Sequence, residues 1–174
     1  LALHARDLKP TARSNLWAGV IAALVFVQIY LGALVAGLDA GWVYNEWPMM
    51  GEGLFPAVMW EPALGWRNWV ENPAIVQFAH RTGAYVLLAA IVAHVWSCWR
   101  WAPGSTHARR ASVLFALVLA QALVGIVTLV MAVPLFWALV HQALAFFTLA
   151  FAVAHWRAMV GPLPLADGRK HLHA

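Results

Sequence analysis

Four long apolar segments with very few charges dominate this chain and limit what it can fold into. They cover about residues 15–37, 72–99, 111–133 and 134–156. Each has the ~20 residues that a helix needs to cross a hydrocarbon layer of ~30 Å. With 63% hydrophobic and only 10% charged residues, and a mean hydropathy of +0.72, the chain is too apolar for a water-soluble domain. The sequence therefore predicts an all-α membrane protein with four spans.

The connections between these segments predict two helical hairpins. Only the short stretch 131–134 separates the last two segments, and no formally charged residue lies between Arg110 and Arg157. The first two segments are joined by the long loop 38–71. We expect one transmembrane domain over residues 1–174. Nothing at the N-terminus resembles a cleavable signal peptide, and the lack of an initiator Met indicates a fragment of a longer protein.

The distribution of positive charge predicts the orientation in the membrane. Nine of the eleven cationic residues flank the segments on one side: Arg6, Lys9, Arg13, Arg100, Arg109, Arg110, Arg157, Arg169 and Lys170. By the positive-inside rule, both termini are expected to be cytoplasmic and the acidic loop 38–71 to face outside. Tryptophans gather at both predicted boundaries, as in the aromatic belts of membrane proteins. The net charge of +4 therefore indicates a lipid bilayer as partner and not nucleic acid.

An internal repeat relates the two predicted hairpins. Gln28 and Gly32 in the first segment have the same spacing as Gln121 and Gly125 in the third, and the second segment matches the fourth at an offset of 61 residues. Both repeats cross the membrane in the same direction, so an axis along the membrane normal relates them. The predicted fold is a transmembrane four-helix bundle built from two repeated helical hairpins, with any cofactor between facing helices. The glutamines are expected to form hydrogen bonds between helices.

Two histidines inside apolar segments, His80 and His141, are candidate ligands of one heme iron. They match at the offset of 61 residues, eight residues after Asn72 and seven after Pro134. At a rise of 1.5 Å per residue, both lie roughly 10–12 Å below the outer surface. Because histidine is costly in hydrocarbon, two such side chains at one depth indicate a shared ligand and not two separate hydrogen-bonded rings.

Three further residues near this depth are candidates for contact with the heme. Gly32 and Gly125 lack side chains where the flat macrocycle needs room, although small residues also let membrane helices pack closely. Arg81 is the only formal charge inside a predicted span. Its planar guanidinium suits a heme propionate, or it extends toward the outer lipid headgroups.

A second histidine pair, His94 and His155, follows the first by 14 residues, which is about 21 Å deeper on nearly the same helix faces. That is the layout of a two-heme cytochrome b. Their neighbours Trp96 and Arg157 instead indicate the inner interface, where imidazoles are easily solvated, so we expect one heme. Cys98, the only cysteine, is expected to be a small apolar filler.

Five motifs match one known family in the same order: LGALVAGLDAG (31–41), YNEWPMM (44–50), ENP (71–73), QFAHR (77–81) and HQ (141–142). Together they closely resemble the C-terminal half of heme A synthase. That family is an eight-helix inner-membrane enzyme made of two similar four-helix bundles. It oxidises the C8 methyl group of heme O to the formyl group of heme A for cytochrome oxidase.

The resemblance implies specific roles and partners. His80 and His141 would bind an auxiliary heme b that relays electrons, while heme O would be the substrate of a site in an absent N-terminal half. Two imidazoles saturate the iron, so no oxygen-binding position remains here, and the catalytic residues are unknown. Implied partners are the N-terminal half or a second copy of the bundle, heme O synthase and cytochrome oxidase assembly factors. The implied location is the bacterial inner membrane, or the mitochondrial inner membrane in a eukaryote.

One departure from the family and two other functions bear on this interpretation. Some relatives carry a cysteine pair in their outer loops, and loop 38–71 has none, so electron input through loop disulfides is not supported.

The first alternative function is a stand-alone membrane cytochrome b, with one or two hemes, for quinol-linked electron transfer. The second is a non-enzymatic heme-binding subunit.

Overall fold

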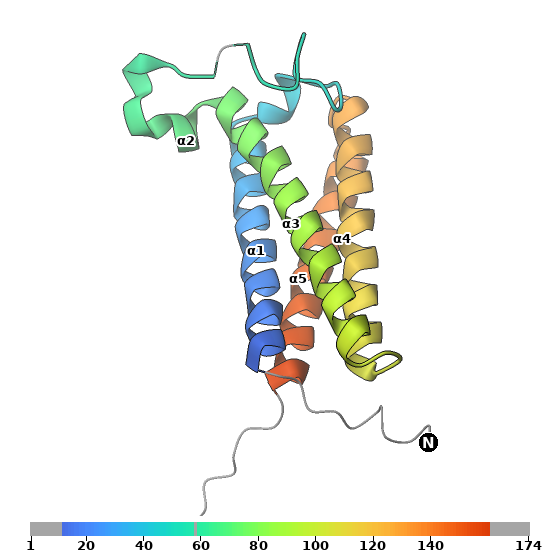
Figure 1. The fold of residues 1–174 in the computed structure, drawn as a ribbon. Helices are drawn as coiled ribbons and strands as arrows, with labels where there is room; N and C mark the ends of the chain where they lie inside the picture. The colour runs from blue at the N-terminus through green and yellow to red at the C-terminus, as the bar shows by residue number, and fades with distance from the viewer. Residues whose placement is uncertain (1–11, 58, 161–174) are drawn as a thin grey trace, which may run out of the picture.

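The four apolar segments form four long helices that make up most of the fold (Figure 1). The computed structural model describes residues 12–57 and 59–160. The long helices are α1 (Ala12–Gly37), α3 (Pro73–Trp101), α4 (Thr106–Val130) and α5 (Leu135–Val160). All four are long and apolar enough to cross a membrane, and the described residues contain no strand. The predicted all-α fold with four spans is confirmed.

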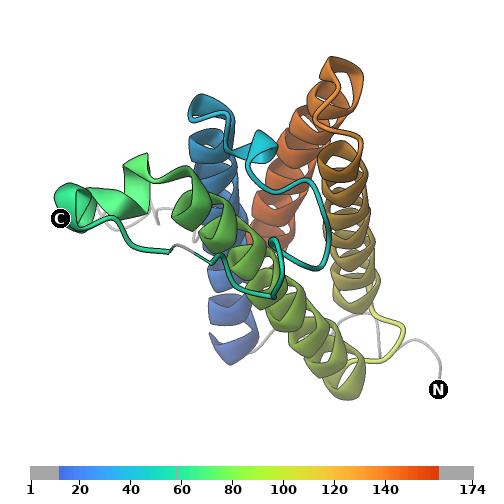
Figure 2. The ribbon, with the colours of Figure 1, turned by 90° about the horizontal axis from the view of Figure 1, so that it is seen from above.

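The helices are arranged as two hairpins that close into a ring. α1 packs on α3 and α4 on α5, while contacts of α1 with α5 and of α3 with α4 complete the ring. α3 and α5 therefore lie diagonally opposite each other (Figure 2). α3 crosses the bundle obliquely, beside α1 at one end and beside α4 at the other (Figure 1).

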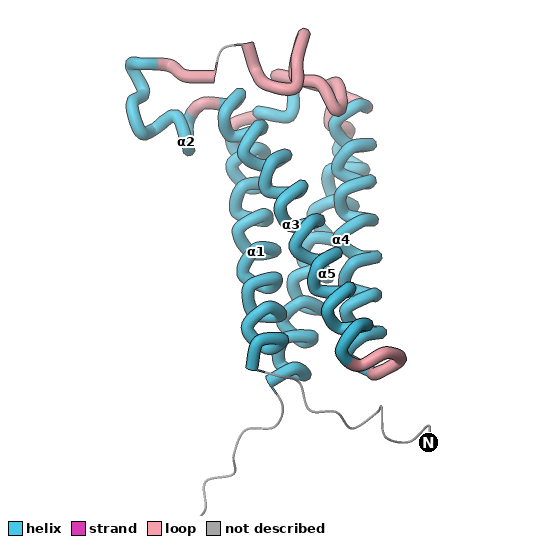
Figure 3. The backbone as a smooth tube through the Cα atoms, in the orientation of Figure 1, coloured by secondary structure: helices cyan, strands magenta, loops and turns pink. Residues whose placement is uncertain are grey.

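The two ends of the bundle differ, and we name them by their connections. The loop end carries residues 38–72, and the turn end carries the short 102–105 connection (Figure 3). Both ends of the described chain lie at the turn end (Figure 1). Four of the cations used to predict orientation, Arg6, Lys9, Arg169 and Lys170, lie outside the described residues. A cytoplasmic turn end therefore stays a prediction.

The bounds of α4 differ from the predicted ones because of local capping and turn geometry. The helix begins at Thr106, five residues earlier than predicted, since the Ser105 hydroxyl accepts a hydrogen bond of 3.1 Å from the Ala108 amide. It ends three residues earlier than predicted, because Ala132 and Val133 adopt left-handed backbone angles with φ of 59° and 54°. The tight reversal between α4 and α5 is the expected hairpin.

Three short helices lie within the connection predicted as a loop: η2 (Ala40–Trp42), η3 (Pro62–Arg67) and α2 (Asn68–Glu71). The last two form an arm that projects sideways from the loop end (Figure 1). Fully buried Asn68 holds this arm together, with Nδ2 donating to the Glu61 and Gly65 carbonyls, each at 2.8 Å. Sequence periodicity gave no sign of these helices, because they depend on polar side chains bonding to the backbone.

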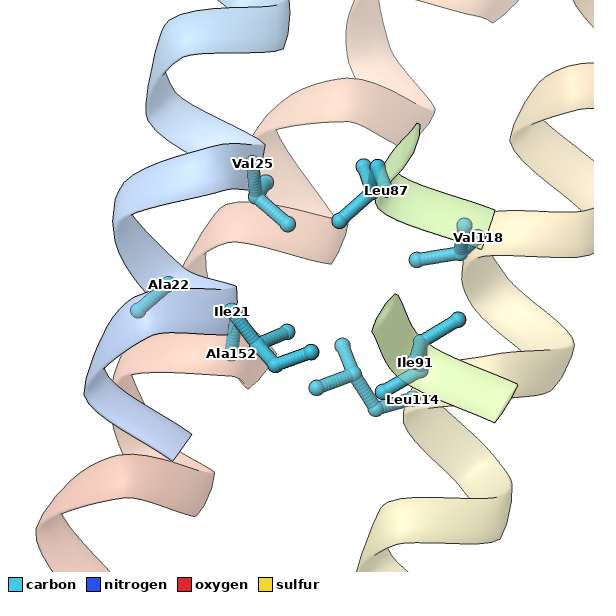
Figure 4. Close-up of a cluster of buried hydrophobic side chains, with 8 residues drawn as sticks. All are labelled: Ile21, Ala22, Val25, Leu87, Ile91, Leu114, Val118 and Ala152. Carbon is cyan, nitrogen blue, oxygen red and sulfur yellow. The ribbon is translucent and has the colours of Figure 1, made fainter. Parts of the chain in front are cut away.

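Buried apolar side chains close the half of the bundle nearer the turn end. One cluster draws on all four long helices: Ile21, Ala22, Val25, Leu87, Ile91, Leu114, Val118 and Ala152 (Figure 4). A second cluster continues toward the turn end: Ala18, Cys98, Ala108, Ala111 and Met159. Cys98 is therefore part of the apolar core, as expected.

The half nearer the loop end is filled differently. None of the helix residues in four stretches is buried: 26–37, 78–86, 119–127 and 135–147. Buried residues return at the loop end itself, including Ala40, Met50 and Val76. A layer without fully buried helix side chains thus lies between the apolar core and the loop end.

Candidate heme-binding site

His80 on α3 and His141 on α5 both lie in this layer, and both residues are partly buried. Their common level follows from His94 and His155, whose Nε2 atoms are 2.9 Å apart across the bundle. His94 follows His80 by 14 residues on α3, and His155 follows His141 by 14 residues on α5. In both helices this interval spans about 21 Å and returns to nearly the same helix face. His80 and His141 are therefore level with each other on the two diagonal helices.

A glycine of the neighbouring helix lies against each of these two rings. A Cβ added at Gly32 would be 3.1 Å from Cε1 of His80, and one added at Gly125 would be 2.8 Å from Cε1 of His141. We expected these glycines to make room for a macrocycle or for close helix packing. In the structure, each makes room for an imidazole.

The two glutamines of the repeat connect helices, as expected. Gln28 on α1 donates to the backbone carbonyl of His80 at 2.9 Å, and its Nε2 is also 3.0 Å from Nδ1 of the ring. Gln121 on α4 donates to the backbone carbonyl of His141 at 3.0 Å, and its Nε2 is 3.4 Å from Nε2 of the ring. The repeat seen in the sequence is thus repeated in the hydrogen bonding around the histidines.

Arg81 follows His80 directly and bonds to the loop. Its guanidinium donates to the backbone carbonyls of Tyr44, at 3.0 Å, and Met49, at 2.9 Å. Both terminal nitrogens are thus used by backbone oxygens of the loop, and pairing with a heme propionate stays a prediction. Its Nε is buried and has no hydrogen-bond partner among the described residues.

Residues 44–50, which we call the strap, lie along α3 beside the site. Gln77 donates to the Tyr44 carbonyl at 2.9 Å, and Tyr85 accepts a hydrogen bond of 3.1 Å from Nε1 of Trp47. Gln77, Arg81 and Tyr85 are spaced by four residues, so they form one stripe on the helix. We did not single out Gln77 or Tyr85 from the sequence, although this spacing of polar side chains in an apolar span was a usable signal.

The second histidine pair is buried inside the bundle. His94 is 2% exposed and His155 is fully buried, so the expectation of solvated rings is wrong. Their Nε2 atoms bond to each other directly at 2.9 Å. Two imidazole–metal bonds of about 2.0 Å would require a separation of roughly 4 Å. The described residues contain no group of three or more His, Cys, Asp or Glu side chains that could hold a metal ion.

Comparison with known proteins assigns the family. The family of cytochrome oxidase assembly proteins, COX15-CtaA, matches residues 2–153. The chain is 51% identical over 164 residues to a heme A synthase of Sinorhizobium fredii and 52% identical over 165 residues to one of Allorhizobium ampelinum. These matches cover 94% and 95% of this chain, but 45% of each relative.

The chain therefore spans about half the length of the curated relatives that it matches. No solved structure matches it. The shared family agrees with the resemblance carried by the loop and histidine motifs. The chain belongs to the COX15-CtaA family of cytochrome oxidase assembly proteins.

Proposed function

We propose that this chain is the C-terminal, heme b-binding half of a heme A synthase, with His80 and His141 as the two iron ligands. One observation carries the proposal. The two histidines are related by the internal repeat and level with each other, in the layer of the bundle where no helix residue is buried. A chain that folds around a large flat cofactor needs such a layer, because the cofactor supplies the missing packing.

The residues present suit this group. Two neutral imidazoles are common axial ligands of heme iron, and Gly32 and Gly125 keep the backbone of α1 and α4 close to the rings. The Nε of Arg81 is an available donor for a heme propionate. When bound, a bis-histidine heme supplies one-electron transfer without an open coordination position. The chain's own residues would therefore hold and orient the group and exclude water, with the strap covering α3 beside it.

The activity of the whole enzyme lies beyond this half. In the proposed enzyme, the C8 methyl group of heme O is oxidised to the formyl group of heme A at a site in the other half. The heme held here would pass electrons to that site. We further propose a bacterial inner-membrane location, with heme O synthase and oxidase assembly factors as partners. The relatives' names and their greater length support this assignment.

The first test is heme binding by the chain itself. We expect the purified protein to bind one b-type heme per chain with a low-spin bis-imidazole spectrum. His80→Ala and His141→Ala should each abolish that spectrum. His107→Ala is the matched control, because His107 lies near the turn end of α4, far along the bundle from the site. Wild-type heme content in both site variants would refute the ligand assignment.

The same measurements address the other two functions. A ratio of two hemes per chain that falls on replacing His94 or His155 would indicate a two-heme cytochrome b. The direct bond between these rings favours one heme instead. A non-enzymatic heme-binding subunit would bind one heme, but would not support heme A formation when joined to the other half of a relative.

A further inference from the structure

A cavity of about 540 Å³ lies at the turn end of the bundle, away from the candidate heme site. Along α3 its lining extends from Ala93 to Trp101, which is about 12 Å of helix. The lining includes exposed Ser97 and buried Cys98, so the cavity reaches from the surface of the bundle into its interior. His80 is 13 residues before Ala93 on the same helix, which places it roughly 20 Å away. The cavity is therefore separate from the candidate heme site.

The walls of this cavity are largely apolar and aromatic. Three tryptophans from two helices line it, and all three are partly exposed: Trp17, Trp96 and Trp101. Indole rings favour the boundary between hydrocarbon and water, because they combine a large apolar surface with one polar N–H. Ala93 and Met159 add further apolar lining. Small-molecule sites commonly have this size and mostly apolar walls, so the cavity suits a ligand with an apolar part.

The charge at the cavity is positive. Arg100 is the only formally charged residue in its lining, and its guanidinium carbon lies 5.9 Å from the centre of the Trp96 ring. This cation–π contact places the charge beside an aromatic wall. Every Asp and Glu among the described residues lies within 38–72, at the opposite end of the bundle. Three further arginines lie on the described helices near the turn end: Arg109, Arg110 and Arg157.

Positive charge and apolar wall lie at different depths in the cavity. Arg100 is close to the end of α3, whereas Ala93 is seven residues, or about 10 Å, further from that end. A free anion would make no use of the aromatic walls, and a wholly apolar ligand would leave the guanidinium unpaired. The ligand that fits both is an amphiphile with an anionic head at the level of Arg100.

We propose that the turn-end cavity binds one anionic phospholipid, with Arg100 donating to the phosphate and the tryptophans packing against the glycerol and the first acyl carbons. The planar guanidinium matches a phosphate in bidentate geometry. Basic pockets between membrane helices are known to bind anionic headgroups. This inference does not depend on heme binding by His80 and His141.

The test measures lipid binding by the purified chain in detergent. Native mass spectrometry counts the lipids retained on each chain from an equal mixture of phosphatidylglycerol and phosphatidylcholine. Arg100→Gln removes the charge, and Ser97→Phe fills the cavity but keeps the charge. Arg157→Gln is the matched control, because Arg157 is exposed near the turn end of α5 and does not line the cavity. Far-UV circular dichroism and elution volume confirm that each variant is folded.

We expect wild-type protein and Arg157→Gln to retain one phosphatidylglycerol per chain in preference to phosphatidylcholine. Arg100→Gln should weaken phosphatidylglycerol binding about tenfold, since a hydrogen bond from a charged group is lost. Folded Ser97→Phe should retain no phosphatidylglycerol selectively. Arg100→Lys keeps the charge without the planar fork, so its affinity should fall between those of wild type and Arg100→Gln.

Four results would overturn the proposal. Equal losses in Arg100→Gln and Arg157→Gln would show a general attraction of lipid to the cations of this end. Wild-type binding by folded Ser97→Phe would place the lipid outside the cavity. Equal retention of the two lipids by wild-type protein would show that the anionic head is not recognised. Thermal stabilisation by inorganic phosphate equal to that by phosphatidylglycerol, and lost in Arg100→Gln, would identify a site for free phosphate and not for a lipid.

Discussion

The Nε2 atoms of His94 and His155 lie 2.9 Å apart across the diagonal of the bundle, and this contact fixes the register of α3 against α5. The two rings meet edge to face, with centroids 5.2 Å apart. Because the same 14-residue interval separates each of them from the first pair, the contact also sets His80 level with His141. A buried polar pair thus aligns the candidate heme ligands from about 21 Å away.

We expect replacement of one partner of this pair to cost more stability than replacement of both. His94→Leu leaves a buried imidazole without its hydrogen bond, at a cost of about 1–3 kcal/mol. The double variant His94→Leu/His155→Leu should be nearly neutral or cost less than the sum of the single changes, since no unpaired polar group remains. Equilibrium unfolding in detergent provides the measurement. Additive costs would show that the two rings are not coupled.

The glycines beside the rings allow a graded test of the site. Gly125→Ala places a Cβ 2.8 Å from Cε1 of His141, whereas Gly32→Ala places one at 3.1 Å from Cε1 of His80. Overpacking of this kind costs about 1–3 kcal/mol, so heme affinity should fall, and more at Gly125. Gly37→Ala is the control, because nothing lies within 4 Å of its added Cβ. Equal heme affinity in all three variants, measured by titration, would contradict the expected order.

The strap should loosen when Arg81 is changed. Arg81→Gln removes both guanidinium bonds to the strap carbonyls. Hydrogen bonds from charged groups contribute about 1.5–3 kcal/mol, so amide exchange in residues 44–50 should quicken by about tenfold or more. Arg109 is exposed on α4, so Arg109→Gln should leave amide exchange in residues 44–50 unchanged. Unaltered exchange in Arg81→Gln would show that Gln77 and Tyr85 hold the strap without it.

The four spans could be predicted because their signal is carried by many residues at once. Apolar length and the 61-residue repeat need no tertiary contact to be recognised. The helix ends and the arm could not be predicted in the same way. Ser105 and Asn68 decide them through single side-chain bonds to the backbone, and such bonds depend on where the neighbouring chain lies.

In the candidate site, too, some residues could be predicted from the sequence and others could not. The histidines and glycines could be singled out because the repeat pairs them, whereas the strap partners could not, since Arg81 and Gln77 bind carbonyls more than 30 residues away. The second pair was misjudged for a physical reason. Nearby Trp96 and Arg157 are exposed, but the rings of His94 and His155 point from the same helices into the bundle.

Orientation can be measured by labelling single cysteines in intact cells. Cys98 is buried, so new cysteines can be introduced at exposed Glu52, at the loop end, and at exposed Pro103, at the turn end. The positive-inside rule predicts that a membrane-impermeant maleimide labels Glu52→Cys and leaves Pro103→Cys unlabelled until the membrane is opened. The reverse pattern would place the candidate heme site in the cytoplasmic half of the membrane.

Electron relay can be separated from structural heme binding in a chimera. This chain would replace the 164 residues that it matches in the Sinorhizobium fredii heme A synthase, so that the relative supplies the other half. If the heme held by His80 and His141 relays electrons, His80→Ala in the chimera should sharply reduce heme A formation. Heme O should still bind, because no catalytic group in the other half has changed.

A loss of electron relay and a loss of the fold would both reduce heme A formation, but they differ in which heme stays bound to the chimera. Chromatography of the extracted hemes separates heme B, heme O and heme A, and a relay defect should leave heme O bound to a folded chimera that has lost its heme B. His107→Ala, away from the site, should leave the heme A yield unchanged. If His80→Ala makes heme A at the rate of the unmodified chimera, the heme in this half does not carry electrons to the reaction, and the relay role must be abandoned.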